Sequence, residues 1–68
     1  MTRQEITNAL IEAGLDRFLV GGFWEGNDCY LSDYDLGRCK TGAVTALMVK
    51  ADYLITDKGL VFQAQVAA

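Results

Sequence analysis

The stretch Asp52–Val66, DYLITDKGLVFQAQV, decides the fold that the sequence predicts, because it has the pattern of a β-hairpin. In its second half, the apolar residues Leu60, Phe62, Ala64 and Val66 alternate with Val61, Gln63 and Gln65. This alternation is typical of a strand with one buried face. The letters DKG, Asp57–Gly59, suit a three-residue loop with the glycine in the left-handed conformation. An antiparallel sheet is therefore expected in this part of the chain.

Two amphipathic helices are predicted before the hairpin. The first covers residues 3–13, because TRQE, Thr2–Glu5, is a capping box and Gly14 stands where a left-handed C-terminal residue is wanted. Its apolar residues recur at offsets of three and four from Ile6. The second helix, Thr41–Ala51, repeats these offsets, which fits either an internal duplication or two independent helices of similar design.

The segment between the helices reads mainly as extended chain. Arg17–Trp24, RFLVGGFW, is aromatic and β-branched and predicts a strand, with a bulge or a close backbone approach at its double glycine. EGND predicts a turn, and Cys29–Leu31 returns as a second strand. Ser32–Gly37, SDYDLG, fits a loop or one short helical turn begun by the serine.

These segments predict the order α-β-β-α-β-β, with two helices packed on one face of an antiparallel sheet. The fold class is therefore a small α+β domain, and residues 1–68 are expected to form that single domain. Hydrophobic residues make up 51% of the chain, which excludes the composition of a disordered protein.

The uncharged runs and the two cysteines indicate in which cellular compartment the protein is expected. The longest uncharged runs, Thr41–Val49 and Gly59–Ala68, are well short of the ~20 apolar residues of a membrane span. No charged-then-apolar leader opens the sequence, so we expect a cytoplasmic protein without membrane association. Cys29 and Cys39 fit reduced thiols, and a disulfide across the short loop between them is the alternative.

The residue types argue against catalysis and cofactor binding. The chain has no histidine, so the commonest general base is missing and two thiols cannot complete the usual zinc site. Cys39 lies between Arg38 and Lys40, which could lower its pKa, but a thiol flanked in this way is weak evidence of a nucleophile. NDCYLSDYD lacks the central glycine and closing glutamate of a calcium loop. We expect a non-enzymatic protein without metal or cofactor.

Negative charge gathers beside aromatic residues in EGNDCYLSDYD, Glu25–Asp35. Between Phe18 and Gly37 there is no lysine or arginine, and residues 1–35 hold seven acidic and two basic residues. Tyrosine and tryptophan often anchor interfaces, and unpaired carboxylates attract a basic partner. A solvated acidic loop with inward-turned aromatics is the alternative. The candidate interface residues are Trp24, Glu25, Asp28, Tyr30, Asp33, Tyr34 and Asp35.

In size, charge and lack of a recognisable motif the chain is similar to small phage-encoded inhibitors, notably anti-CRISPR proteins and DNA mimics. This resemblance implies a stoichiometric inhibitor whose acidic surface occupies a basic groove of a protein or nucleoprotein complex. The protein would then act in the host cytoplasm, as a monomer or small homo-oligomer. Such proteins share no motif, so the resemblance assigns no individual residue.

A second resemblance is local. YLITDKG resembles the wing segment of winged helix-turn-helix regulators, and LGRCKTGAVTALM resembles their turn and recognition helix. This resemblance covers Leu36–Gly59 and implies a DNA-binding regulator with Thr45 and Lys50 on the DNA and Lys58 on a phosphate; Lys40 would add a further cation. The net charge of −3 and the scarcity of base-reading side chains argue against direct nucleic-acid binding.

Overall fold

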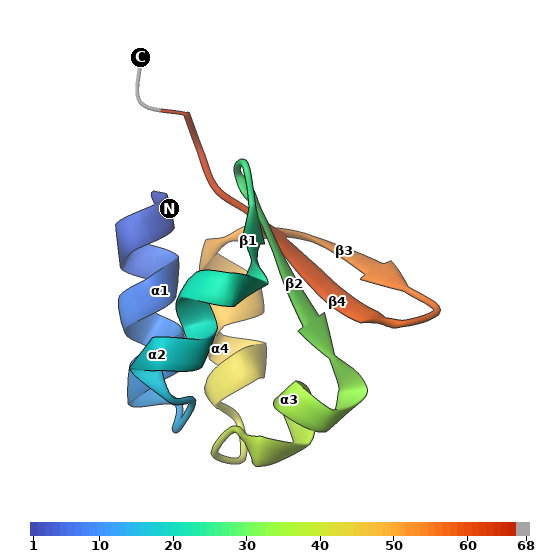
Figure 1. Cartoon of the computed structure of the whole chain (residues 1–68). Helices are drawn as coiled ribbons and strands as arrows, with labels where there is room; N and C mark the ends of the chain where they lie inside the picture. The colour runs from blue at the N-terminus through green and yellow to red at the C-terminus, as the bar shows by residue number, and fades with distance from the viewer. Residues whose placement is uncertain (67–68) are drawn as a thin grey trace.

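The computed structural model, which describes residues 1–66, contains a four-stranded antiparallel sheet and several short helices (Figure 1). The strands run in the order β1-β2-β4-β3 across the sheet; they are β1 (Trp24–Glu25), β2 (Asp28–Ser32), β3 (Asp52–Thr56) and β4 (Gly59–Gln63). The helices are α1 (Arg3–Glu12), α2 (Arg17–Val20), α3 (Asp33–Arg38) and α4 (Ala43–Lys50). The predicted α+β class is confirmed.

Helix α1 forms where the sequence predicts it. The capping box is present: the Glu5 amide donates to Thr2 Oγ1 at 3.2 Å, and the Thr2 amide donates to Glu5 Oε1 at 3.0 Å. After the helix, Gly14 has a φ of +117°, a conformation that an L side chain rarely adopts. The Lys40 amide donates to the Ala13 carbonyl at 2.8 Å, which ties the end of α1 to the turn before α4.

The prediction of a strand over Arg17–Trp24 is wrong. The segment forms helix α2 followed by a 3-10 turn over Gly21–Phe23, and only its last residue enters β1. The cause is a local cap, because the Asp16 side chain accepts from the Phe18 amide at 2.8 Å and so begins a helix. As a result Val20 is buried, whereas Phe18 is 88% exposed.

The sequence predicts either a loop or a short helical turn for Ser32–Gly37, and the structure shows a helix there. Ser32 caps α3 and forms a second capping box with Asp35, whose Oδ2 accepts from the Ser32 amide at 3.1 Å. Helix α4 begins after Gly42 and ends at Lys50, inside the predicted range. The predicted order of six elements is incomplete, because α2, the 3-10 turn and α3 are additional.

The C-terminal hairpin is confirmed, with a shorter loop than predicted. Strands β3 and β4 pair from Asp52 opposite Gln63 to Thr56 opposite Gly59, so only Asp57 and Lys58 lie in the loop. Strand β2 pairs with the other side of β4, from Asp28 opposite Gln63 to Ser32 opposite Gly59. The sheet thus places β2 and β3 on either side of β4, although many residues separate them in the sequence.

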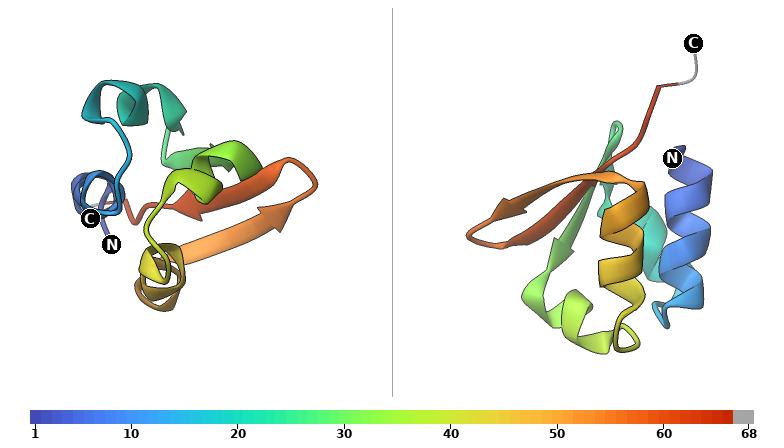
Figure 2. Two further views of the ribbon diagram at one scale, coloured as in Figure 1. Left: turned by 90° about the horizontal axis from the view of Figure 1, so that it is seen from below. Right: turned by 180° about the vertical axis from the view of Figure 1, so that it is seen from behind.

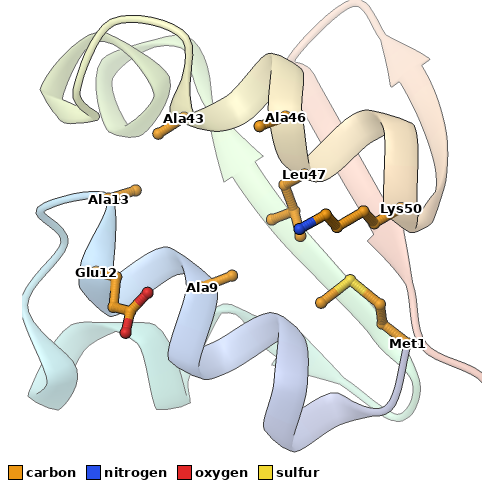
Figure 3. Close-up of a pocket in the computed structure, with 8 residues that line it drawn as sticks. All are labelled: Met1, Ala9, Glu12, Ala13, Ala43, Ala46, Leu47 and Lys50. Atoms are coloured by element: carbon orange, nitrogen blue, oxygen red, sulfur yellow. The ribbon is translucent and has the colours of Figure 1, made fainter.

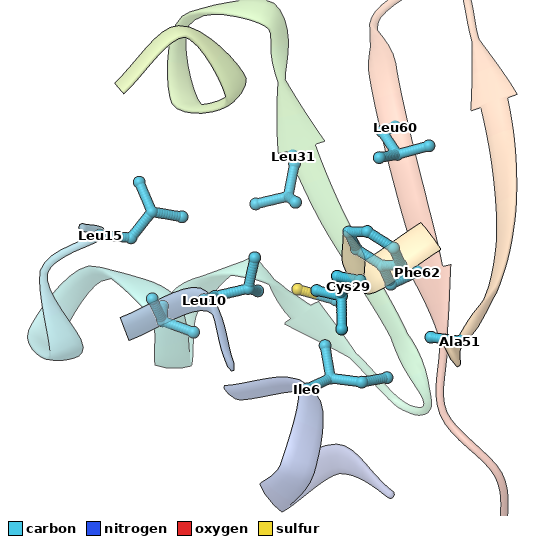
Figure 4. Close-up of a cluster of buried hydrophobic side chains, with 10 residues drawn as sticks. Ile6, Leu10, Leu15, Cys29, Leu31, Ala51, Leu60 and Phe62 are labelled. Atoms are coloured by element: carbon cyan, nitrogen blue, oxygen red, sulfur yellow. The ribbon is translucent and has the colours of Figure 1, made fainter. Parts of the chain in front are cut away.

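The core lies between one face of the sheet and the helices. Cys29 and Leu31 of β2 and Leu60 and Phe62 of β4 alternate onto this face. Helices α1, α2 and α4 cover it with Ile6, Leu10, Val20 and Leu47. Figure 4 shows Ile6 and Leu10 of this cluster beside Cys29. Figure 2 shows α1 and α4 side by side, seen from behind the view of Figure 1. None of the helices in residues 1–66 has the length and apolar character to cross a membrane.

Candidate protein interface

The strand register separates the predicted interface residues onto different faces. Trp24 lies opposite Cys29, and Glu25 lies opposite Asp28. Because directly opposite residues point to the same side of a sheet, Trp24 shares the core face with Cys29, and the two carboxylates share the other face. We call that second face, which carries Glu25, Asp28, Tyr30, Asp52, Leu54 and Val61, the open face.

Trp24 is part of the folded core and not a free interface anchor. Its Nε1 donates to Thr7 Oγ1 on α1 at 3.0 Å, and the Arg3 guanidinium carbon lies 5.0 Å from the ring centroid. The indole is half-buried and packs against the buried cluster. For Trp24 the alternative of an inward-turned aromatic therefore holds. Phe23 is half-buried as well, because it lies in the 3-10 turn where strand alternation does not apply.

A row of carboxylates crosses one end of the open face. The register places Glu25 opposite Asp28, Asp28 opposite Gln63, and Gln63 opposite Asp52. Neighbouring Cβ atoms in such a row are about 4.5–5.5 Å apart. Sequence reasoning missed Asp52, since only the pairing of β2 with β4 brings it into line with Glu25 and Asp28. The hairpin pattern alone could have placed Asp52 opposite Gln63.

An apolar row lies next to the carboxylates. Tyr30, Val61 and Leu54 stand opposite one another on β2, β4 and β3. Val61 is only 5% exposed, because its two neighbours shelter it, but Tyr30 is 48% and Leu54 52% exposed. Large apolar side chains that stay exposed in adjacent positions are a common mark of an interaction surface. The open face therefore combines apolar area with a charged border.

The remaining predicted residues lie on α3, where they have separate roles. Asp35 is a capping residue that accepts from the Ser32 amide and, at 2.8 Å, from Ser32 Oγ. Tyr34 is exposed, and the Arg38 guanidinium carbon lies 5.7 Å from its ring centroid while Nη1 donates to the phenol oxygen at 3.4 Å. Tyr34 thus has a cation beside it. Asp33 is exposed in the first turn of α3.

A shallow hollow connects α3 to the open face. It has a volume of about 230 Å³, and its lining includes Tyr30, Ser32, Asp35, Lys58 and Val61. Asp35 and Lys58 thus stand at the end of the face opposite to the carboxylate row. The structure brings Glu25, Asp28 and Tyr30 together, adds Asp52, and moves Trp24, Asp33 and Tyr34 to other surfaces.

Both cysteines are free thiols, so the alternative of a disulfide between them is wrong in this structure. Burial raises the pKa of Cys29 to about 12. Burial, and next the Asp35 carboxylate, also raise the pKa of Cys39. The pKa of Cys39 is thus not lowered by its neighbours Arg38 and Lys40, because desolvation of the thiolate is the largest effect on it. Neither thiol has the character of an activated nucleophile.

A second groove lies between α1 and α4 and is drawn in Figure 3. Its volume is about 280 Å³, and the lining residues are Met1, Ala9, Glu12, Ala13, Ala43, Ala46, Leu47 and Lys50. Four alanines leave this space open, because their short side chains do not fill the gap between the helices. Glu12 and Lys50 contribute one negative and one positive charge from opposite walls, so the groove has no excess of either charge.

Comparison of the chain with protein-family models, with curated proteins and with solved structures gave no match in any of the three.

Proposed function

We propose that this is a non-enzymatic binding protein that docks its open face on a basic surface of a nucleic-acid-handling partner. The observation that supports the proposal most directly is the row of side chains formed by Glu25, Asp28, Gln63 and Asp52. This row lies beside the exposed side chains of Tyr30 and Leu54. A basic partner is the occupant that fits, because its cations would meet the carboxylate row while its apolar atoms cover the neighbouring row.

The two rows would contribute differently to binding. Burial of Tyr30 and Leu54 would supply most of the affinity, since interface energy concentrates in a few large side chains. The carboxylates would speed encounter and exclude acidic competitors. These acids have no basic neighbour in their own rows, because the positions opposite them hold Gln63 or another acid.

Inhibition is the mode of action that this chemistry favours. A basic groove that normally holds a phosphate backbone would be occupied by Glu25 and Asp28, and nucleic acid would be excluded. The complex would be stoichiometric and without turnover. This mechanism agrees with the resemblance to anti-CRISPR and DNA-mimic proteins, and it implies that the protein acts in the cytoplasm of a host cell.

A titration with a defined basic probe tests the open face directly. An arginine-rich peptide of about 12 residues is added to isotopically labelled protein, and amide shifts are followed by NMR. We expect the largest shifts at Asp28, Tyr30 and Leu54, and a loss of affinity when Glu25→Lys and Asp28→Lys are combined. The matched control combines Glu12→Lys and Asp57→Lys, which change the net charge equally on other surfaces.

Two results would overturn this proposal. One is equal weakening by both double variants, which would mean that only net charge matters. The other is a set of shifts centred on α1 or α3 instead of the open face.

A second candidate function, DNA binding, is supported by the succession of α3, a four-residue turn, α4 and the β3–β4 hairpin. The turn Cys39–Gly42 has the length and the glycine typical of a helix-turn-helix, and Gly42 has a φ of +84°. On α4 the exposed Thr45 and Lys50 would face DNA, with Lys40 and Lys58 on phosphates. A low-salt gel shift with duplex DNA tests this candidate, and absence of a complex at micromolar protein would eliminate it.

A further inference from the structure

The carboxylate row of the open face has a regular spacing that a partner must match. The row runs across all four strands, with Glu25 on β1, Asp28 on β2, Gln63 on β4 and Asp52 on β3. Because neighbouring strands lie about 4.8 Å apart, the second, third and fourth positions fall about 4.8, 9.6 and 14.4 Å from Glu25. A partner element that meets the whole row needs side chains at the same intervals.

An α-helix that lies across the strands has these intervals. Residues at i, i+3, i+7 and i+10 share one face of a helix, and the last three lie about 4.5, 10.5 and 15 Å from the first along its axis. Each therefore comes within about 1 Å of its place in the row. An extended chain does not fit, because its same-side residues are about 6.8 Å apart and the second of them falls between Asp28 and Gln63.

We propose that the open face binds a basic α-helix of the partner, laid across the four strands; this inference rests on the proposed function and specifies which element of the partner docks. Cations at i, i+3 and i+10 would face Glu25, Asp28 and Asp52, and an uncharged residue at i+7 would face Gln63. The position of Gln63 as third in the row fixes the direction of the helix, with its N-terminus over β1. In the reverse direction one cation would face Gln63, and Asp28 would face the uncharged residue.

The apolar row fits the same helix. Tyr30, Val61 and Leu54 lie on β2, β4 and β3 two residues along from the carboxylate row, a distance of about 6.8 Å. A helix with its side chains is about 10–12 Å in diameter, so a helix seated on the carboxylates also covers this row. Tyr30 and Leu54 are about half exposed and gain burial there. The partner helix is therefore amphipathic, with apolar residues in the stripe beside its cations.

Two alanine-rich peptides of 15 residues test the spacing. The first has arginines at peptide positions 2, 5 and 12 and glutamine at position 9, all on one helix face. In the second, which has the same composition, the middle arginine is moved to position 7, on the opposite face. In an NMR titration the first peptide should bind roughly 3–5-fold more tightly, since it makes one more ion pair. Its circular dichroism should also become more helical on binding, because so short a peptide is only partly helical alone.

A protein variant assigns the contact to one carboxylate. Asp28→Asn removes the charge that faces the arginine at peptide position 5, so it should lower the affinity for the first peptide to that for the second. The affinity for the second peptide should change little, because that peptide has no arginine opposite Asp28. Asp57→Asn is the matched control: it removes the same charge from the exposed β3–β4 loop and should affect both peptides alike.

Equal affinity for the two peptides, or binding of the first without a gain in helicity, would refute the helix. If the arginine-rich peptide of the earlier experiment still shifts the open-face amides in that case, the proposed function stands and only this inference fails. If none of the three peptides shifts the open face, both fail.

Discussion

The Cα of Gly59 lies so close to the backbone of Leu31 that a Cβ at position 59 would collide with the Leu31 carbonyl oxygen. Gly59 opens β4, and Leu31 lies near the end of β2. This contact lets the C-terminal hairpin lie flush against β2. The close pairing of β2 with β4 in turn places Asp28 and Asp52 in one row on the open face.

We expect Gly59→Ala to destabilise the protein by roughly 2–4 kcal/mol, because it adds a backbone collision to a strained φ. That φ is +143°, which an alanine rarely adopts. Chemical denaturation followed by circular dichroism measures the change. Gly37→Ala is the control: it lies in α3 with open space around it and should be neutral or stabilising by about 0.5–1 kcal/mol. A neutral Gly59→Ala would contradict the contact.

Truncation of two phenylalanines should affect the free energy of unfolding to very different extents. Phe62 is fully buried in the core cluster, so Phe62→Ala should cost about 3–5 kcal/mol. Phe18 projects from α2 into solvent, so Phe18→Ala should stay within about 0.5 kcal/mol of the parent. Thermal unfolding of both variants checks this. A large loss from Phe18→Ala would favour the strand that the sequence predicts over α2.

The acids of α3 should differ in their effect on stability. Asp35→Ala removes the acceptor for the Ser32 amide and hydroxyl, and we expect a loss of about 0.5–2 kcal/mol. Asp33→Ala removes no hydrogen bond of the capping box and should cost less than half as much. Urea denaturation distinguishes the two. Equal losses would mean that only negative charge near the helix N-terminus matters.

Stability should depend on pH through Glu5. The hydrogen bonds with Thr2, first from its backbone amide, hold the pKa of Glu5 below its ordinary value. A lowered native pKa stabilises the protein above the unfolded pKa, and the stabilisation is lost as the pH falls through the native value. Glu5→Gln should therefore lower the melting temperature slightly at pH 7 and have little effect near pH 2. An equal effect at both pH values would contradict the linkage.

The two thiols should differ in reactivity. Because the pKa of Cys29 is about 12, the fraction of Cys29 in the thiolate form near neutral pH is roughly a thousandfold lower than for an ordinary thiol. Cys39 is half-buried, so iodoacetamide at pH 8 should label it first. Mass spectrometry of the native protein follows both rates, and labelling in denaturant, where both thiols react alike, is the control. Faster labelling of Cys29 would contradict its burial.

The sequence by itself determined the features that depend on neighbours along the chain. The capping box of Thr2 and Glu5 and the positive φ of Gly14 form as predicted, because the interacting groups are a few residues apart. The C-terminal hairpin also forms, although its loop holds two residues where three were predicted. The unequal charge of the two halves is likewise a property of the sequence alone.

Only the tertiary structure decided which of the predicted interface residues share a surface. A strand's register on a distant partner is set by packing and is not visible in local patterns, so Asp52 joined Glu25 and Asp28 through β4. Trp24 turned inward because its pairing with Cys29 places it on the core face, where its Nε1 donates to Thr7 Oγ1 on α1. The segment Arg17–Val20 became helical because the Asp16 cap outweighed strand propensity, which is itself a weak and context-dependent preference.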